Sequence, residues 1–270
     1  GERTFVMGVL NLSPDSFSGD GLGYDVEAAV ALALRLLADG AGLIDVGGES
    51  TRPPGRFYGV GAAPVSIQEE LGLVLPVIER LKEAISLPIS IDTYKADVAY
   101  RAVIAGATVI NDVWGLKKDP EIASIASENK VPLILTHNQQ TTEYTDIIPD
   151  IINGLKESIQ IALERGVDIH QIVIDPGIGF GKTPEGNLEI LRRLDEFRSI
   201  IRRPVMVGTS RKSTIGLVTE VPVPDDRVEG TAATVALAVA KQVDMIRVHD
   251  VLQMRRVARM SDAIVRGWRD

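Results

Sequence analysis

Polar residues stand at the ends of most of the short apolar runs in this chain, and they are the first candidates for chemistry. They are Asn11, Asp45, Asp92, Asn111, Asp112, His137, Asp175 and His249. If the apolar runs are parallel strands of a barrel, their carboxyl ends and the loops after them form the face where such barrels carry out catalysis. Polar groups elsewhere in the barrel would be buried without purpose. The shared position predicts an active site at the strand ends, although any single side chain could instead cap a loop.

The segment from Asp175 to Thr183 is rich in glycine and ends in Gly-Lys-Thr, as nucleotide-binding loops do. Its spacing does not fit them. A P-loop needs glycine five positions before Gly181, where Pro176 stands, and the dinucleotide fingerprint needs its third glycine where Lys182 stands. The glycines instead let the backbone turn sharply beneath a ligand. Phe180 would then either stack on a ring or anchor the loop.

Residues 208–213 follow the predicted seventh strand, where barrels often hold anions with loop amides and a short helix. Lys212 is a candidate ligand contact or Schiff-base nucleophile, and the alternative is a solvated loop lysine. The neighbouring strand-end aspartates favour a role in the site.

Two long stretches, residues 11–25 and 47–66, precede the first two predicted helices. Loops of this length on a compact barrel are usually lids or binding loops. Arg52 could donate two hydrogen bonds to a phosphate, and the alternative is an exposed loop charge.

Composition narrows the function classes. The formal net charge of −8 argues against nucleic acid as a partner, and the absence of cysteine excludes disulfides and thiolate chemistry. Without cysteine, nothing indicates an oxidising compartment, so we expect a cytoplasmic protein. No apolar stretch approaches the ~20 residues that span a bilayer.

The three histidines, His137, His170 and His249, lack the spacing of a zinc site. His170 precedes a strand and is expected on the opposite, stability face, whereas His249 follows Arg247 at the end of the last strand.

The elements that must position these residues alternate regularly. Short β-branched runs predict strands at 5–10, 43–46, 88–91, 108–110, 132–135, 172–174, 204–207 and 245–248. Helical periodicity predicts helices at 26–37, 67–84, 96–105, 120–128, 147–165, 187–197, 229–241 and 252–265. Eight such alternations without a linker predict an α/β fold in which residues 1–270 form a single (β/α)8 TIM barrel, with long loops after strands 1 and 2.

Taken together, seven segments resemble the dihydropteroate synthase family of pterin-binding enzymes over nearly the whole chain. They are residues 9–18 (VLNLSPDSFS), 47–53 (GGESTRP), 91–95 (IDTYK), 110–112 (IND), 175–180 (DPGIGF), 208–213 (GTSRKS) and 247–250 (RVHD). The resemblance implies the condensation of 6-hydroxymethyl-7,8-dihydropterin diphosphate with p-aminobenzoate to give 7,8-dihydropteroate and diphosphate, a step of folate biosynthesis. In the implied mechanism diphosphate leaves first, and the arylamine attacks the cationic pterin methyl group.

The resemblance also assigns residues to the substrates, one group at a time. It implies that the pterin is bound by Asp92, Asn111, Asp175, Phe180, Gly208, Lys212 and Arg247. It implies that the diphosphate is bound by Asn11, Thr51, Arg52, Arg247 and His249, with Asn11 also touching a Mg2+ cofactor. It implies that p-aminobenzoate is bound by Phe17, Thr51, Pro53 and Ser213. The implied catalytic residues are Asp92, Lys212, Arg247 and His249.

Three positions depart from the family pattern. Thr136 stands where a methionine usually underlies the pterin, and Thr214 replaces a common phenylalanine. The first loop reads Ser-Gly-Asp-Gly at 18–21 instead of Ser-Asp-Gly-Gly. As for assembly and inhibition, the resemblance implies a homodimer of a sulfonamide-target family, with an apolar patch on the late helices that could support the dimer.

Three other functions remain open from the sequence. A pterin-binding methyltransferase would share the strand-end aspartate and asparagine, but it would not need Thr51-Arg52-Pro53 or residues 210–213. A non-catalytic barrel would bind a pterin without turnover. A Schiff-base aldolase would use Lys212 as its nucleophile.

Overall fold

The structure is a computed structural model that describes residues 2–13, 22–51 and 61–268. The sheet order is β6-β5-β4-β3-β2-β1-β8-β7, and each of the pairs along it is parallel. The strands are β1 Phe5–Asn11, β2 Leu43–Gly47, β3 Ile89–Asp92, β4 Val109–Asp112, β5 Leu133–Thr136, β6 Ile172–Asp175, β7 Met206–Val207 and β8 Met245–Val248. A bridge between Ile174 and Val205 joins β6 to the residue before β7 and closes the ring. The predicted (β/α)8 barrel is confirmed.

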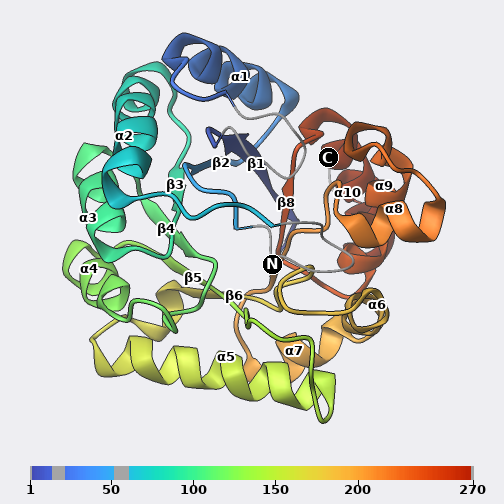
Figure 1. Ribbon diagram of the computed structural model, residues 1–270. Helices are drawn as coiled ribbons and strands as arrows, with labels where there is room; N and C mark the ends of the chain where they lie inside the picture. The colour runs from blue at the N-terminus through green and yellow to red at the C-terminus, as the bar shows by residue number, and fades with distance from the viewer. Residues whose placement is uncertain (1, 14–21, 52–60, 269–270) are drawn as a thin grey trace.

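Helices surround the strands on the outside of the barrel (Figure 1). They are α1 Val26–Asp39, α2 Ile67–Ala84, α3 Ala96–Ala105, α4 Glu121–Asn129, α5 Ile147–Glu164, α6 Pro184–Arg192, α7 Leu194–Ile201, α8 Ser213–Thr219, α9 Val228–Ala240 and α10 Val251–Arg266. Two short 3-10 turns, Ile169–Gln171 and Pro224–Asp226, complete the elements. Within the described part of the chain, no helix is both long and apolar enough to cross a membrane.

Local sequence explains where several of these elements begin. Pro88, Pro132 and Pro204 precede β3, β5 and β7 because proline has no N–H for the ladder. Their carbonyls still accept hydrogen bonds from the neighbouring strands at 2.9 to 3.1 Å, so the chain is already aligned with the sheet. At the start of α2, Ser66 and Glu69 form a capping box.

The helices predicted from the sequence differ from the structure in two places: one predicted helix is two, and one short helix was not predicted. The single helix expected over 187–197 is instead α6 and α7, which meet at Arg193. The break turns the second helix so that Leu194 and Phe197 are both fully buried. The seven-residue α8 was not predicted as a helix, because it is too short to show a helical period.

The side chains inside the barrel change from apolar to polar toward the carboxyl ends of the strands. The apolar part is a cluster of Met7, Leu43, Ile134 and Met206, with Val109, Val173 and Met245 packed against them. Toward the carboxyl ends the strand register aligns Asn11 with Gly47, Gly47 with Asp92, and Asp92 with Asn111. Three polar side chains that are far apart in sequence therefore lie in one row across β1, β3 and β4.

Candidate active site

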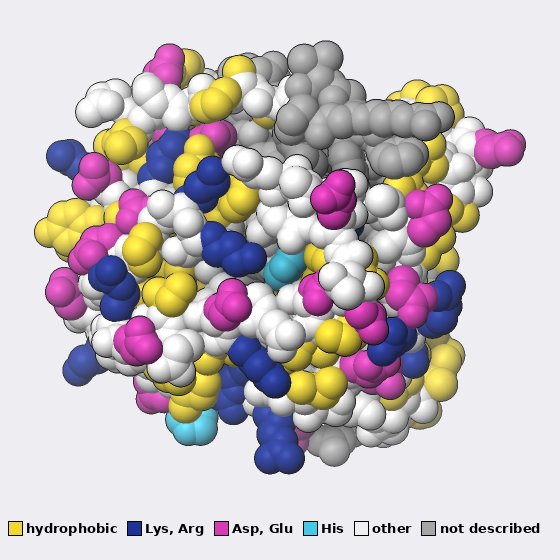
Figure 2. Space-filling view, turned by 60° about the horizontal axis from the view of Figure 1, so that its bottom comes forward, with side chains coloured by type: hydrophobic (Ala, Val, Ile, Leu, Met, Phe, Trp, Pro, Cys, Tyr) yellow, Lys and Arg dark blue, Asp and Glu magenta, His cyan; other side chains and the backbone are white. Residues whose placement is uncertain are grey.

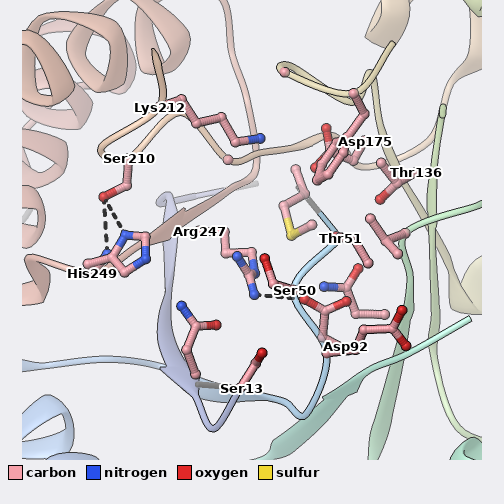
Figure 3. A pocket seen from close by; sticks show the side chains of 18 residues that line it. Ser13, Ser50, Thr51, Asp92, Thr136, Asp175, Ser210, Lys212, Arg247 and His249 are labelled. Carbon is pink, nitrogen blue, oxygen red and sulfur yellow. Dashed lines mark hydrogen bonds and ion pairs between the residues drawn. The ribbon is translucent and has the colours of Figure 1, made fainter. Parts of the chain in front are cut away.

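A cavity of about 870 Å3, counting its open mouth, lies at the carboxyl ends of the strands. Its walls come from the ends of the strands and the loops after them (Figure 3). The lining residues are Asn11, Ser13, Glu49, Ser50, Thr51, Asp92, Asn111, Val113, Thr136, Asp175, Gly179, Phe180, Met206, Gly208, Ser210, Lys212, Arg247 and His249. This is the face on which barrel enzymes carry their sites.

Arg247 lies between two carboxylates at the floor of the cavity. Its Nε donates to Asp45 Oδ2 at 2.6 Å, and its Nη2 donates to Asp92 Oδ2 at 2.9 Å. Asp45 is fully buried and also accepts a hydrogen bond from Asn111 Nδ2 at 3.1 Å. One guanidinium is thus held by side chains from β2 and β3, and a charge-assisted pair of this kind fixes its plane.

Burial controls the protonation of Asp92. Burial raises the pKa of this carboxyl to about 7. The charge of Arg247 acts to lower this pKa, and the charge of Asp45 acts to raise it. Perturbation by desolvation together with a specific charged partner is typical of functional carboxylates in clefts. Asp92 can therefore exist in either protonation state near neutral pH.

Asn111, which is aligned with Asp92 in the strand register, has an unpaired acceptor atom within the described ranges. Its Oδ1 is buried and has no hydrogen-bond partner among the described residues, while its Nδ2 is occupied by Asp45. Buried polar atoms are almost always paired in folded proteins. An unpaired amide oxygen on the cavity wall is suited to a donor of a bound ligand.

Asp175, at the end of β6, and Lys212, in the loop after β7, both line the cavity. Burial raises the pKa of Asp175, although Lys212 acts to lower it, and burial lowers the pKa of Lys212 to about 8, although Asp175 acts to raise it. The Lys212 ammonium lies 4.4 Å from the centroid of the Phe180 ring and donates to the carbonyl of Ile178. Lys212 is therefore not a solvated loop lysine, and Phe180 faces the cavity with a cation on its ring.

The loop after β6 depends on glycine. Gly177 has φ +74°, and a Cβ there would lie 1.9 Å from the carbonyl oxygen of His137. Gly179 donates from its backbone to Asn187 Oδ1 at 2.8 Å, and Asn187 Nδ2 donates to Thr214 Oγ1 at 2.9 Å. Thr214 is thus the acceptor that orients the side chain holding Gly179.

Lys182, the lysine of the Gly-Lys-Thr sequence, lies in the same loop. It is fully buried, and its Nζ donates to the carbonyls of Phe180 at 2.8 Å and His137 at 3.2 Å. Burial, followed by the charge of Lys182, lowers the pKa of the His137 imidazole to about 2, so this histidine is neutral. His170 lies in the 3-10 turn before β6, on the amino-terminal side of the barrel, as expected.

His249 and Ser210 connect the loops after β8 and β7. His249 Nδ1 lies 3.0 Å from Ser210 Oγ, and the backbone N–H of His249 donates to the same oxygen at 3.2 Å. Arg211 does not line the cavity; it forms an ion pair with Asp250 at 2.7 Å, which ties the same two loops together. Figure 3 shows Ser210 and His249 on the side of the cavity opposite Asp92.

Most of the residues expected in the site are brought together. Ten of the predicted residues line the cavity, namely Asn11, Thr51, Asp92, Asn111, Asp175, Phe180, Gly208, Lys212, Arg247 and His249. Ser213 is not among the lining residues; it begins α8, and its Oγ is buried with no hydrogen-bond partner in the described part of the chain. Phe17, Arg52 and Pro53, and the altered first loop at 18–21, lie outside the described residues. Thr136 lines the cavity.

Sequence reasoning missed several lining residues. Four of them lie in segments already singled out from the sequence, and those segments could have indicated them. They are Glu49, Ser50, Gly179 and Ser210. Ser13 also belongs to such a segment. Val113 and Met206 had no chemical signal, because an apolar wall residue looks like any core residue in sequence. Among the described residues, no group of three or more metal-ligating side chains is present.

Comparison with known proteins agrees with this geometry. The model of the family described as "Pterin binding enzyme" matches residues 7–249. A dihydropteroate synthase of Bacillus subtilis is 49% identical over 98% of this chain and 90% of its own length. A crystal structure of a Clostridium difficile dihydropteroate synthase in the presence of pteroic acid is 47% identical and covers 98% of both chains with a TM-score of 0.91. The Yersinia pestis dihydropteroate synthase in a sulfonamide drug complex is 36% identical, covers 97% of this chain and 94% of its own, and has a TM-score of 0.89.

Proposed function

Because the chain belongs to the dihydropteroate synthase family of pterin-binding enzymes, we propose that the cavity condenses 6-hydroxymethyl-7,8-dihydropterin diphosphate with p-aminobenzoate. The bond between the pterin methylene carbon and the diphosphate oxygen breaks, and diphosphate leaves with the electron pair. The amino nitrogen of p-aminobenzoate then forms a bond to that carbon and loses one proton. The products are 7,8-dihydropteroate and diphosphate.

The pterin would occupy the floor of the cavity, between Asp92 and Lys212. A pterin edge carries an amino group and ring nitrogens beside a carbonyl, which match the carboxylates of Asp92 and Asp175 and the ammonium of Lys212. The unpaired Oδ1 of Asn111 supplies one further acceptor. Phe180 and Gly208 border the ring plane.

Asp92 has a second role in the proposal. Positive charge develops on the pterin methylene carbon as diphosphate departs, and an ionised carboxylate fixed beside it stabilises that charge. Arg247 holds the Asp92 carboxylate at 2.9 Å, and Asp45 in turn holds Arg247. We propose Asp92, Lys212, Arg247 and His249 as the catalytic residues.

The diphosphate would lie toward the open side of the cavity. Asn11, Thr51, Arg247 and His249 line the cavity and would bind it there, with Arg247 reaching up from the floor, and Arg52, outside the described residues, would join them. Arginine and imidazole groups stabilise negative charge on a leaving phosphate.

We propose Mg2+ as the cofactor, held by Asn11 Oδ1. The residues present fit this ion because Mg2+ keeps several waters and is usually bound through one or two protein oxygens together with substrate phosphates. A site of this kind does not need the three-residue cluster that is absent from the described residues. When bound, the ion would neutralise charge on the departing diphosphate.

The p-aminobenzoate site would be built from Phe17, Thr51, Pro53 and Ser213. Of these, Thr51 lines the cavity, and Ser213 begins α8 directly after Lys212. Sulfonamides would compete with p-aminobenzoate for this part of the site.

We also propose that the protein is a cytoplasmic homodimer in which residues 1–270 form one catalytic domain. The late helices expose apolar side chains that a second copy would cover, namely Leu217, Val218, Leu237, Met260 and Ile264. In the view of Figure 2, Lys and Arg side chains are interspersed with Asp and Glu and do not gather in one basic area. The formal net charge of −8 supports small-molecule substrates over nucleic acid.

The observation that carries the proposal is the convergence of Asp92, Asn111, Asp175, Lys212 and Arg247 on one cavity. The test is to incubate the protein with the dihydropterin diphosphate, Mg2+ and p-aminobenzoate, omit one component at a time, and quantify dihydropteroate by mass spectrometry. Product that requires both organic substrates supports the proposal. Pterin binding without product would favour a methyltransferase or a non-catalytic barrel, and a borohydride-trapped adduct on Lys212 would favour a Schiff-base enzyme.

A further inference from the structure

A cluster of buried charges lies just outside the cavity, between β2, α2 and the segment after β3. The Lys95 ammonium is its centre. Lys95 Nζ donates to Glu49 Oε2 at 2.5 Å, to Glu70 Oε2 at 2.6 Å and to the carbonyl of Val65 at 2.6 Å. The three partners flank both ends of the loop between β2 and α2, so one cation holds both ends of that loop.

All three charged side chains are largely removed from water. The side chains of Lys95, Glu49 and Glu70 are 12%, 8% and 1% exposed. Burial alone would lower the pKa of Lys95, but its hydrogen bonds to Glu49 and Glu70 and their charges raise it overall, so the ammonium stays charged. Buried ion pairs of this kind add little net stability because desolvation offsets their attraction, which favours a role in position or specificity.

Glu49 connects this cluster to the cavity. It lines the cavity next to Ser50 and Thr51, and Tyr94 donates to its Oε1 at 3.0 Å. Both of its carboxylate oxygens are therefore engaged by residues that follow β3, three positions or fewer after Asp92. The backbone here is also tightly packed, because a Cβ on Gly48 would lie 2.9 Å from Glu70 Cγ.

A carboxylate in this wall presents a problem for the reaction. Both proposed substrates carry negative charge, on the diphosphate of one and the carboxylate of the other. An unneutralised Glu49 would repel them through a medium of low dielectric, where charge interactions are strong. Its neutralisation therefore matters to binding.

We propose that Lys95 is a positioning residue that cancels the charge of Glu49 and fixes the wall from Glu49 to Thr51, so that this side of the cavity accepts anionic substrates. The inference rests on the proposed function and adds to it a residue that does not itself line the cavity. It predicts a loss that is specific to anions, whereas a purely structural role for Lys95 would weaken every ligand alike.

The test measures binding without turnover, so it does not depend on whether the condensation occurs. Calorimetric titration with inorganic diphosphate and Mg2+ gives one dissociation constant, and titration with a pterin that lacks the diphosphate gives another. Lys95→Met is expected to weaken diphosphate binding about tenfold, because an uncompensated carboxylate then faces the cavity, and to leave pterin binding unchanged within about twofold. Lys156→Met, at an exposed lysine on α5, is the matched control and should change neither.

Two further variants separate charge from structure. Adding Glu49→Gln to Lys95→Met removes the uncompensated charge and should restore most of the diphosphate affinity. Glu49→Gln alone leaves Lys95 with Glu70 as its one carboxylate partner among the described residues and should tighten diphosphate binding. This variant keeps the test decisive if Lys95→Met does not fold. Equal weakening of diphosphate and pterin in Lys95→Met, no rescue in the double variant, or weaker diphosphate binding in Glu49→Gln would each overturn the proposal.

The pH profile gives an independent readout. Among the residues that the structure describes, the titratable groups that face Glu49 are Lys95 and Tyr94 from the segment after β3 and Glu70 from α2. Burial raises the pKa of Glu70, and Lys95 opposes this rise. Without Lys95 the pKa of Glu70 should rise further, so the Lys95→Met protein carries less negative charge beside the cavity at low pH than at high pH. Its diphosphate binding should therefore weaken as pH rises, relative to the unmodified protein. Parallel pH profiles would contradict the proposal.

Discussion

Arg247 and Asp92 face each other across the floor of the cavity, with Nη2 and Oδ2 2.9 Å apart. The arginine comes from β8 and the aspartate from β3, 155 positions apart in the chain. In the proposed reaction the first binds the substrate's negative charge and the second stabilises the positive charge that develops.

Asp92→Asn removes the charge and keeps the shape. We expect kcat/KM for dihydropteroate formation to fall by about 10² to 10³, because one preorganised charge at the reacting centre is lost. Steady-state kinetics measure this directly. An Asp92→Asn variant with more than half of the normal rate would exclude a role for this carboxylate in the chemistry.

The same carboxylate predicts a pH dependence of activity. Burial raises the pKa of Asp92 to about 7, and the ionised form is the active one in the proposed mechanism. In the unliganded protein, kcat/KM should therefore rise with pH up to about 7 and level off above it. A profile that is flat from pH 5 to 8 would contradict the assignment.

Stability should depend on pH with the opposite sign. In an unfolded chain the pKa of an aspartate is about 3.9. In the folded protein, burial raises the pKa of both Asp92 and Asp112 to about 7. Between these values the folded protein binds more protons than the unfolded chain, so the free energy of unfolding should fall as pH rises from about 4 to 7. Urea titrations across this range measure it, and the decline should be shallower in Asp92→Asn. A steeper decline in that variant would contradict the assignment.

Asp45 should matter although it does not line the cavity. Asp45→Ala leaves the Arg247 Nε and the Asn111 amide without their shared acceptor, and the cost of breaking such a buried pair is about 3 kcal/mol or more. We expect a lower urea midpoint together with reduced kcat. Asp45→Asn should retain more stability and still lose activity, because a neutral amide holds the guanidinium less firmly. Full activity in both variants would show that Arg247 needs no support from β2.

Gly177→Ala tests the loop that carries Phe180. Its φ of +74° and the 1.9 Å approach to the His137 carbonyl leave no space for a methyl group. We expect a loss of about 2 kcal/mol or more and weaker pterin binding. The control is Gly23→Ala, which has φ +58° but no atom within 4 Å, and which should cost only about 1 kcal/mol. Equal effects at the two sites would mean that backbone strain, not the close approach, is what matters.

The polar residues at strand ends predicted much of the site. Asp45 is the exception, because the same pattern did not reveal that it lies below the cavity. Asp92 and Asp175 are the last residues of β3 and β6 and line the cavity. Asp45 gives the same signal in sequence, but it lies two residues before the end of β2 and pairs with Ser90 in the register, one layer deeper. Because side chains alternate along a strand, Asp45 still points inward and becomes the partner of Arg247.

Other features could not be read from the sequence for physical reasons. Lys95 was part of a recognised segment, but its partners Glu49 and Glu70 meet only when α2 packs beside β3. Met206 and Val113 line the cavity with ordinary apolar side chains. The break between α6 and α7 at Arg193 is set by the burial of Leu194 and Phe197, and tertiary packing of this kind overrides local helix periodicity.

The most direct test of the central claim follows diphosphate release and dihydropteroate formation in the same samples, with the unmodified protein and with Asp92→Asn. The account predicts one diphosphate released for each dihydropteroate formed when both substrates are present, and nearly complete loss of both products in the variant. Tight pterin binding with no dihydropteroate from the unmodified protein would contradict it, as would equal product formation by the variant.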